Sequence, residues 1–146
     1  MSLRDFSVRM RRRVREVEVG VDRIVRETAL LCDRELVLTT PVDTGRARSN
    51  WQVSVGAAET EAIPAYSEGE GGSTGAANAQ AALDQGRAAV AGRGQGQTIF
   101  ITNNLPYIGR LNDGYSAQAP AGFVQTAVQT AMEYVRNRAR VLGRGN

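Results

Sequence analysis

Three groups of residues in this chain have types and spacings that could do chemistry. Asp43 stands in an Asp-Thr-Gly triplet, and two aspartates brought together in such turns can share a proton and activate water. Acidic side chains that could repel phosphate gather in the middle of the chain, at Glu59, Glu61, Glu68 and Glu70. An N-terminal cluster that could contact phosphates or acidic surfaces consists of Arg9, Arg11, Arg12, Arg13 and Arg15.

The context of Asp43 favours a backbone turn over catalysis. Retropepsin-like aspartic proteases carry this triplet after an apolar strand in a nearly all-β fold, and Ile108-Gly109-Arg110 resembles a second signature of that class. Here a charged helix and Pro41 lead into the triplet. Proline fixes its own φ, Asp43 can accept from the N–H two residues on, and Gly45 tolerates positive φ. We expect a turn, with a dimeric aspartic protease using Asp43 as the alternative.

The sequence has few residues of the types that other catalytic or metal sites require. The chain has no histidine and no lysine, and Cys32 is its single cysteine, which excludes an internal disulfide and a thiolate metal cluster. Glu68 and Glu70 offer too few ligands for calcium. The glycine run 92–96 follows a helix and precedes a strand, the reverse of a phosphate-binding loop. We expect no catalytic residue, cofactor, metal or small-molecule substrate, and Cys32 as a core residue.

The arginine cluster has two interpretations. No aromatic residues interleave with it, which argues against stacking on single-stranded nucleic acid. Asp5, Glu16 and Glu18 dilute its positive field. A solvated helix end or a contact for an acidic neighbour is therefore expected, and a basic nucleic-acid-binding protein remains an alternative.

The elements that must position these residues begin with a long amphipathic helix. Apolar-face positions recur at spacings of three and four: Val14, Val17, Val21, Ile24, Thr28, Leu31, Glu35 and Leu38. Gly20 lowers helix propensity, so a break there is an alternative to a continuous helix. Pro41 disfavours helical geometry at Thr40 and predicts a helix end at Leu38 or Thr39.

Two strands and two further helices complete the expected fold. Residues 51–55 and 97–103 are predicted as strands, 59–75 as a flexible acidic loop, and 76–91 as a short helix weakened by Gly86. Residues 112–114 should form a turn, Pro120 should begin the last helix and Gly143 should cap it. Trp51, Phe100, Phe123 and Tyr134 are expected in or near the core.

These elements predict one α+β domain over residues 1–146. A small antiparallel sheet would be covered by a long N-terminal helix and a C-terminal helix, with a flexible acidic Gly/Ala-rich insertion. The net charge is +3, and no apolar run is long enough to span a bilayer, so we expect a soluble protein with no membrane partner.

An ordered series of short motifs resembles the head–tail joining, minor tail or tail-completion family of long-tailed bacteriophages. It runs from the Pro-Val-Asp-Thr-Gly turn and the Trp-bearing strand to Asn-Asn-x-Pro-Tyr, a Gly-Tyr-Ser turn and Gln-Ala-Pro-x-Gly-Phe. The residues that carry this resemblance, expected to shape turns or assembly contacts, are Pro41, Asp43, Thr44, Gly45, Trp51, Asn103, Asn104, Pro106, Tyr107, Gly114, Pro120, Gly122 and Phe123.

The resemblance implies a non-enzymatic structural protein of the virion neck or upper tail, made in the bacterial host cytoplasm. It implies a homo-oligomeric ring, six-fold or twelve-fold, that contacts the head connector on one side and tail proteins on the other. DNA would pass through the channel without specific binding. We expect the acidic segment with Glu59, Glu61, Glu68 and Glu70 to face that channel, and the basic helix end to meet a partner.

Overall fold

The computed structural model of this chain describes residues 2–144, which form an α+β fold with a small antiparallel sheet. The expected fold class is therefore confirmed. The elements in chain order are α1 (Leu3–Thr39), α2 (Arg46–Ser49), β1 (Gln52–Val55), α3 (Gly75–Ala91), β2 (Ile99–Thr102), α4 (Ile108–Asn112) and α5 (Phe123–Arg144).

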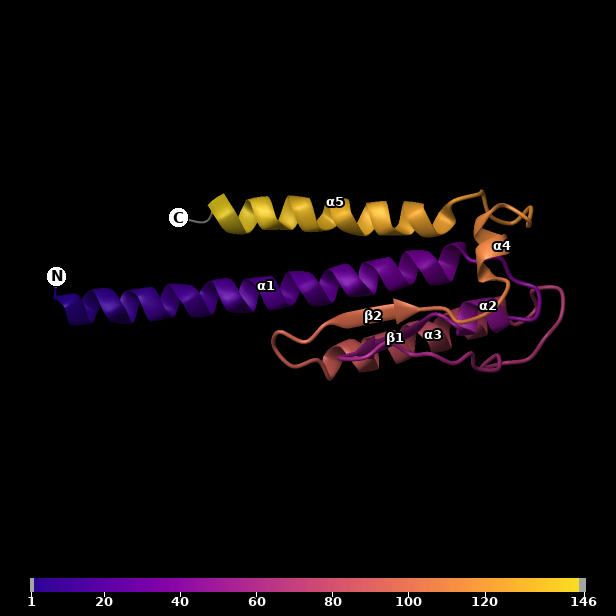
Figure 1. The fold of residues 1–146 in the computed structure, drawn as a ribbon, viewed down its shortest axis with the longest axis horizontal. Helices are drawn as coiled ribbons and strands as arrows, with labels where there is room; N and C mark the ends of the chain where they lie inside the picture. Colours follow the sequence, from indigo (N-terminus) through magenta and orange to yellow (C-terminus); the bar gives the residue numbers. More distant parts are fainter. Residues whose placement is uncertain (1, 145–146) are drawn as a thin grey trace.

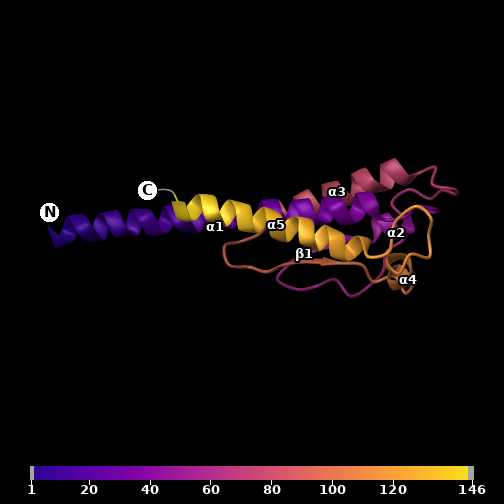
Figure 2. The ribbon, with the colours of Figure 1, turned by 90° about the horizontal axis from the view of Figure 1, so that it is seen from above.

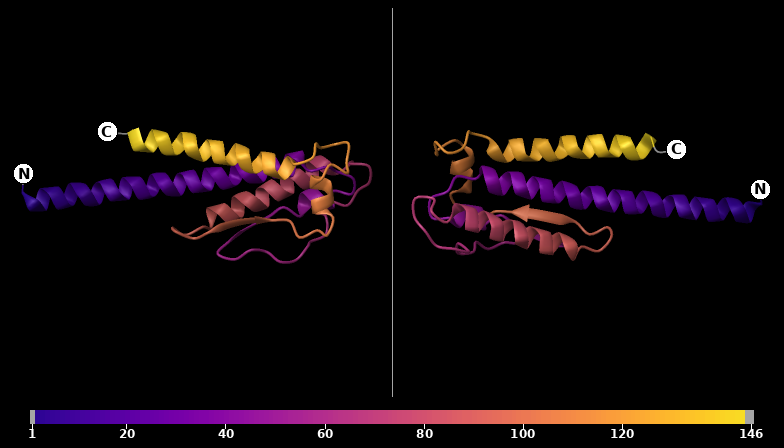
Figure 3. Two further views of the ribbon diagram at one scale, coloured as in Figure 1. Left: turned by 45° about the horizontal axis from the view of Figure 1, so that its top comes forward. Right: turned by 180° about the vertical axis from the view of Figure 1, so that it is seen from behind.

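Helix α1 lies in the middle of the molecule, between α5 on one side and the sheet with α3 on the other (Figure 1). α5 runs antiparallel to α1, and α3 packs against both α1 and β1 (Figure 3). β1 and β2 pair from Gln52 opposite Thr102 to Val55 opposite Ile99. Helix cover thus completes a two-stranded sheet that would be marginal alone.

Helix α1 is continuous through Gly20, so the break considered there does not occur. A Cβ atom on Gly20 would lie 2.9 Å from Leu142 Cδ2, which shows that glycine lets α5 approach closely at this point. Ser2 and Asp5 form a reciprocal capping box at the N-terminus. The helix ends at Thr39, as Pro41 predicts.

The N-terminal part of α1 projects beyond the end of α5 (Figures 1 and 2). At 1.5 Å per residue, the 37 residues of α1 span about 55 Å and the 22 residues of α5 about 33 Å. We call residues 2–18, which lie before the Gly20–Leu142 contact, the overhang.

The core gathers where α1, α3 and α5 meet the start of the sheet. Its buried members are Leu36, Val37, Trp51, Ala79, Ala82, Ala119, Phe123 and Ala127. Cys32 is partly buried against this cluster, as expected. Phe100 and Tyr134 are half-buried, at the periphery of the packed region.

Several boundaries differ from the predictions. Trp51 precedes β1, and both strands are four residues long. α5 begins at Phe123 instead of Pro120 because Asn112 accepts hydrogen bonds at the helix start, from Gly122 N (2.7 Å) and Val124 N (3.0 Å). Gly143 lies inside α5, so its prediction as a cap is wrong.

The segment 59–74 contains no helix or strand, yet polar side chains tie its backbone to the rest of the fold. Asn50 Oδ1 accepts from Ile63 N at 2.8 Å, and Asn78 Oδ1 accepts from Ser67 N at 2.8 Å. α3 spans Gly75–Ala91, so the helix expected over 76–91 is confirmed. Mobility of the acidic segment stays a prediction, but its path is anchored at these two points.

Candidate assembly surfaces

The turn segments 40–50, 103–107 and 112–122 meet at one end of the molecule, which we call the turn end (Figure 1). α1 ends here, α2 and α4 lie here and α5 begins here. Residues from all three segments line one pocket of about 380 Å³, among them Pro41, Tyr107 and Gln118. The pocket thus brings together residues as far apart in sequence as Pro41 and Gln118, and five predicted turn residues line it: Pro41, Asp43, Thr44, Gly45 and Tyr107.

Gln118 joins two of these segments by pairing with the backbone of Val42. Its Oε1 accepts from Val42 N at 2.8 Å, and its Nε2 donates to Val42 O at 2.9 Å. One side-chain amide therefore satisfies both backbone groups of a residue whose neighbour, Pro41, cannot donate. Motif similarity located Gln118, but its role as a backbone partner was not predicted.

Asp43 is exposed and links the Asp-Thr-Gly turn to the acidic segment. Its Oδ1 accepts from Gly71 N at 3.1 Å, and its backbone O accepts from Gly72 N at 2.8 Å. We predicted that Asp43 accepts from the N–H two residues on, and this was wrong. Its carboxylate instead accepts from Gly71, 28 residues later in the chain. Gly45 has φ +82°, and a Cβ there would lie 2.0 Å from Asn78 Nδ2. The chain bends at residues 43–45, and the positive φ and the close contact leave no room for a side chain at Gly45.

A buried hydrogen-bond network, which was not predicted from the sequence, joins α2 to α3 beside the turn end. Asn78 on α3 and Ser49 on α2 are both fully buried, and Ser49 Oγ donates to Asn78 Oδ1 at 2.8 Å. Asn78 Nδ2 donates to Ser67 O at 2.8 Å and to Thr74 O at 3.0 Å. Lone polar residues in an alanine-rich helix carry little periodic signal, although a buried asparagine must find such partners.

The Asn-Asn-x-Pro-Tyr motif closes the other side of the turn end. Asn103 Nδ2 donates to Ala47 O at 3.0 Å, and Asn104 Nδ2 donates to Glu59 O at 3.0 Å. Leu105 between them and Pro106 is buried. In the following turn Gly114 has φ +91°, and Gly122 has φ +80° before α5. These residues act through backbone shape and hydrogen bonds to loops.

The four glutamates lie exposed along the acidic segment. Glu68 and Glu70 line an open pocket of about 830 Å³ together with Thr44 and Arg46, so one base stands beside this acidic pair. Glu59 and Glu61 carry exposed side chains, and their backbone carbonyls accept from Asn104. An orientation of these side chains toward a channel stays a prediction.

The arginine cluster lies on the overhang. Arg12 and Arg13 pair with Glu16 at 3.1 and 3.6 Å, and Arg11 Nη2 donates to Ser7 Oγ at 3.4 Å. Exposed pairs of this kind contribute little to stability. Arg9 and Arg15 are also exposed on the same helix. The cluster is therefore solvated in the isolated chain and open to a partner.

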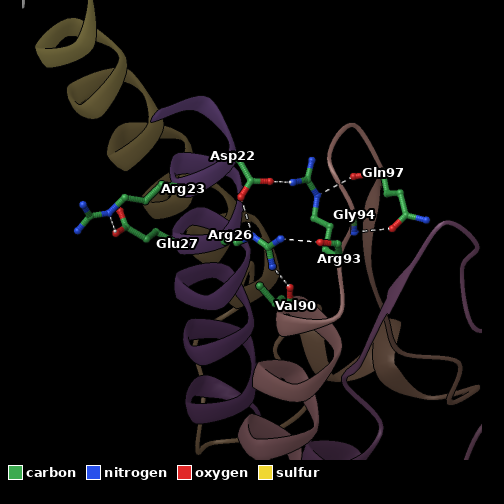
Figure 4. A network of polar contacts seen from close by, with 8 residues as sticks. All are labelled: Asp22, Arg23, Arg26, Glu27, Val90, Arg93, Gly94 and Gln97. Atoms are coloured by element: carbon green, nitrogen blue, oxygen red, sulfur yellow. Dashed lines mark hydrogen bonds and ion pairs between the residues drawn. The ribbon is translucent and has the colours of Figure 1, made fainter. Parts of the chain in front are cut away.

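A polar clamp holds the glycine-rich connection between α3 and β2 against α1 (Figure 4). Arg93 is buried, pairs with Asp22, and donates through Nε to Gln97 O at 2.8 Å. Arg26 binds Asp22 at 2.8 Å and donates to the carbonyls of Val90 and Arg93. The hydrogen bond from Arg26, with burial opposing it, lowers the pKa of Asp22. Gly96, with φ +78°, lies in the turn that Gln97 N closes by donating to Gly94 O at 3.2 Å.

Glu27 makes the corresponding link between α1 and α5. It accepts from the Tyr134 hydroxyl and pairs with Arg23 at 2.8 Å and Arg138 at 3.4 Å. The hydrogen bond from Tyr134, followed by that from Arg23, lowers the pKa of Glu27. This partly buried polar group therefore joins α1 to α5.

Asp33 is a buried carboxyl group on the face of α1 that packs against α3. It is 1% exposed, and neither oxygen has a hydrogen-bond partner among the residues the structure describes. A Cβ atom on Gly86 would lie 2.4 Å from Asp33 Oδ2, so the absence of a side chain at Gly86 allows α3 to pack closely against α1. Burial raises the pKa of Asp33 to about 7, with Arg87 opposing the shift.

Apolar side chains form a second surface, along the groove bounded by α1, α5 and β2. Two adjoining hollows of about 500 and 510 Å³ share Ile24, Val25 and Val135 in their walls. The first continues toward Leu142, and the second continues toward Ile101. We call this pair of hollows the trough. An apolar surface of this extent marks a candidate protein contact.

The part of the chain that the structure describes, residues 2–144, contains neither a candidate metal cluster nor a membrane-spanning helix. No group of three or more His, Cys, Asp or Glu residues in this part of the chain could hold a metal ion. No helix within it has the length and apolar character needed to cross a membrane. Comparisons with protein-family models, with curated proteins and with solved structures found no match to this chain.

Proposed function

We propose that this chain is a non-enzymatic structural subunit of the neck or upper tail of a long-tailed bacteriophage, one copy in a ring that joins head connector to tail tube. The observation that carries the proposal is the turn end. Motifs that resemble the head–tail joining family along the sequence interlock in space through Gln118, Asn103 and Asn104. Their side chains satisfy backbone groups of neighbouring loops, which suits a scaffold.

The shape and surface of the molecule support a role in assembly. A subunit of a ring needs faces that bury against neighbours, and the chain exposes both a projecting amphipathic helix and an apolar trough. Asp43 accepts hydrogen bonds from Gly71 N and Gly72 N, which is a structural role. These two features favour an assembly part over the aspartic protease.

The charge distribution suits a conduit for DNA. The exposed glutamates between residues 59 and 70 would repel phosphates if they lined a lumen, which lets DNA pass without being held. The arginines of the overhang would then contact a protein neighbour and not the DNA.

Depletion of this protein during phage infection tests the proposal. The expected result is an accumulation of DNA-filled heads and separate tails, and complementation with the wild-type chain should restore joined particles. Complementation with Asp43→Asn should also restore them, because the amide keeps an oxygen that can accept from Gly71 N. Joined, infectious particles in the absence of the protein would contradict the proposed role.

A further inference from the structure

The overhang carries an apolar stripe that the rest of the described chain, up to residue 144, leaves largely exposed. Leu3 is 90% exposed, and Phe6, Met10 and Val14 are each 49% exposed. Their spacings of three and four place them on one face of α1, in line with Val17 and with Ile24, which lines the trough beside α5. The face that packs on α5 over the second half of α1 therefore continues uncovered over the first.

The trough is an acceptor of matching chemistry and sufficient length. Its walls include Cys32 from α1, Met132 and Val135 from α5, and Ile99 and Ile101 from β2. The part beside β2 has one charged lining residue among those described, Arg93, and its guanidinium is already paired with Asp22. Measured along α1 from Arg13 to Cys32, the trough extends about 28 Å, which is enough for the roughly 21 Å from Leu3 to Val17.

The overhang cannot occupy the trough of its own chain. α1 is one unbroken helix from Leu3 to Thr39, and its N-terminal part projects past the end of α5 (Figure 2). The residues of α1 that line the trough run from Arg13 to Cys32 along the same helix, so the stripe from Leu3 to Met10 cannot fold back onto them. A chain that presents both a projecting helix and a groove elsewhere on its surface makes a heterologous contact, which closes into a ring when the rotation between copies permits.

Two copies could join by pairing their overhangs, or by placing the overhang of one copy in the trough of the other. The distribution of charge favours the second arrangement. The overhang has six arginines against three acids, whereas residues 19–144 have twelve arginines against twelve acids. The overhang thus carries the whole net charge of +3, and the body is neutral. Pairing two overhangs would bring two sets of six arginines together. An overhang laid in the trough of another copy would meet only one arginine of that copy's overhang, Arg13, at the end of the trough.

We propose that the overhang of one copy docks, apolar stripe inward, in the trough of a second copy of this chain. The inference rests on the proposed function, since it names the contact between subunits of the ring. Apolar residues of the stripe would lie against Val135, Met132 and Ile101, while the arginines on the opposite face would point away from the trough, toward an acidic surface of a further neighbour. Each subunit in the ring then gives one helix and receives one.

Disulfide trapping between two differently marked full-length chains tests the contact. Both carry Cys32→Ala, which removes the single native thiol. The donor chain carries Phe6→Cys, Met10→Cys or Val14→Cys, positions about one helical turn apart, and the acceptor chain carries Met132→Cys and an affinity tag. A disulfide forms only when the two Cα atoms come within about 7 Å, so one donor position should reach the acceptor.

The expected result is a donor–acceptor disulfide for at least one stripe position, formed several-fold more than with Arg12→Cys, which lies on the opposite face of the overhang. Circular dichroism checks that each chain keeps its helices. Predominant donor–donor product would overturn the proposal, because it means that overhangs pair with each other. Absence of any product from concentrated chains would overturn it as well, and would leave the virion role standing if the chain is present in particles.

Discussion

Trp51 connects the end of α1 to the start of β1 through packing and one hydrogen bond. It is 5% exposed, belongs to the buried core, and donates from Nε1 to Thr40 Oγ1 at 2.7 Å. Trp51→Ala should lower the free energy of unfolding by about 3 to 5 kcal/mol, because it leaves a cavity. Urea denaturation measures this loss. Trp51→Phe should lose less, since most of the apolar contact remains, and equal losses for the two variants would contradict cavity formation as the cause.

The buried Asp33 predicts a dependence of stability on pH. Its pKa rises from 3.8 to about 7 on folding, because burial disfavours the charged form. The folded chain therefore holds an extra proton between these values, and the stabilisation present at low pH is lost as the pH rises toward 7. The loss reaches at most about 4 kcal/mol. Arg87 opposes the shift. Burial raises the pKa values of Cys32 and Tyr66, and the nearby Asp33 adds to both shifts.

Asp33→Asn should remove this dependence. Between pH 5 and pH 8 the unfolding free energy of the wild-type chain should fall relative to that of the variant, as measured by urea denaturation at each pH. Asp113→Asn, in an exposed turn, is the matched control and should follow the wild-type chain. Parallel curves for wild type and Asp33→Asn would show that Asp33 does not ionise in this range.

Single residues of the turn end could be named from the sequence, but most of their partners could not. Turn chemistry predicts positive φ at Gly45, and the structure has it. Asp43 binds a segment 28 residues away, and Gln118 binds Val42 across 76 residues. Such partners depend on the tertiary arrangement, which local rules do not contain. The same holds for Asp33, whose burial follows from the approach of α3.

At the scale of elements, two glycines set how closely helices approach. Gly20 admits Leu142 of α5, and Gly86 admits Asp33 of α1. Helix propensity alone would describe both as weak points. The structure instead shows close helix contacts at both positions, so propensity was outweighed by packing.

Gly86→Ala should destabilise the fold although alanine is the better helix former. A Cβ atom there would meet Asp33 Oδ2 at 2.4 Å and Val53 Cγ2 at 3.2 Å, so α3 must shift outward. The expected loss is about 1 to 3 kcal/mol by thermal or urea unfolding. Gly143→Ala in α5 meets nothing within 4 Å and should be neutral or slightly stabilising. A stabilising Gly86→Ala would contradict the close packing of α1 and α3.

The long elements followed from periodicity, and the short ones did not. The two long helices, α3 and both strands were predicted because their patterns extend over enough residues to be recognised. α2 and α4, with four and five residues, are too short for a periodic signal. The start of α5 was missed because Asn112, eleven residues upstream of Phe123, determines where the helix begins.

At the scale of the whole molecule, charge is divided between the basic overhang and the acidic segment at the other end of the fold. If the acidic segment lines the conduit, changing Glu59, Glu61, Glu68 and Glu70 together to glutamine should impair retention or delivery of DNA. Counting infectious particles against DNA-filled particles measures the effect. The exposed pair Asp113→Asn and Glu133→Gln serves as the control, and full infectivity of the quadruple variant would count against the lumen assignment.

The central claim is that this chain is a structural part of the particle. Electron imaging of intact virions, with the density fitted by this fold, tests it most directly. The account predicts a ring of copies between the head connector and the tail tube, with each overhang lying on its neighbour. Particles whose neck contains no copy of this chain, together with peptide hydrolysis by the purified protein that Asp43→Asn abolishes, would contradict it.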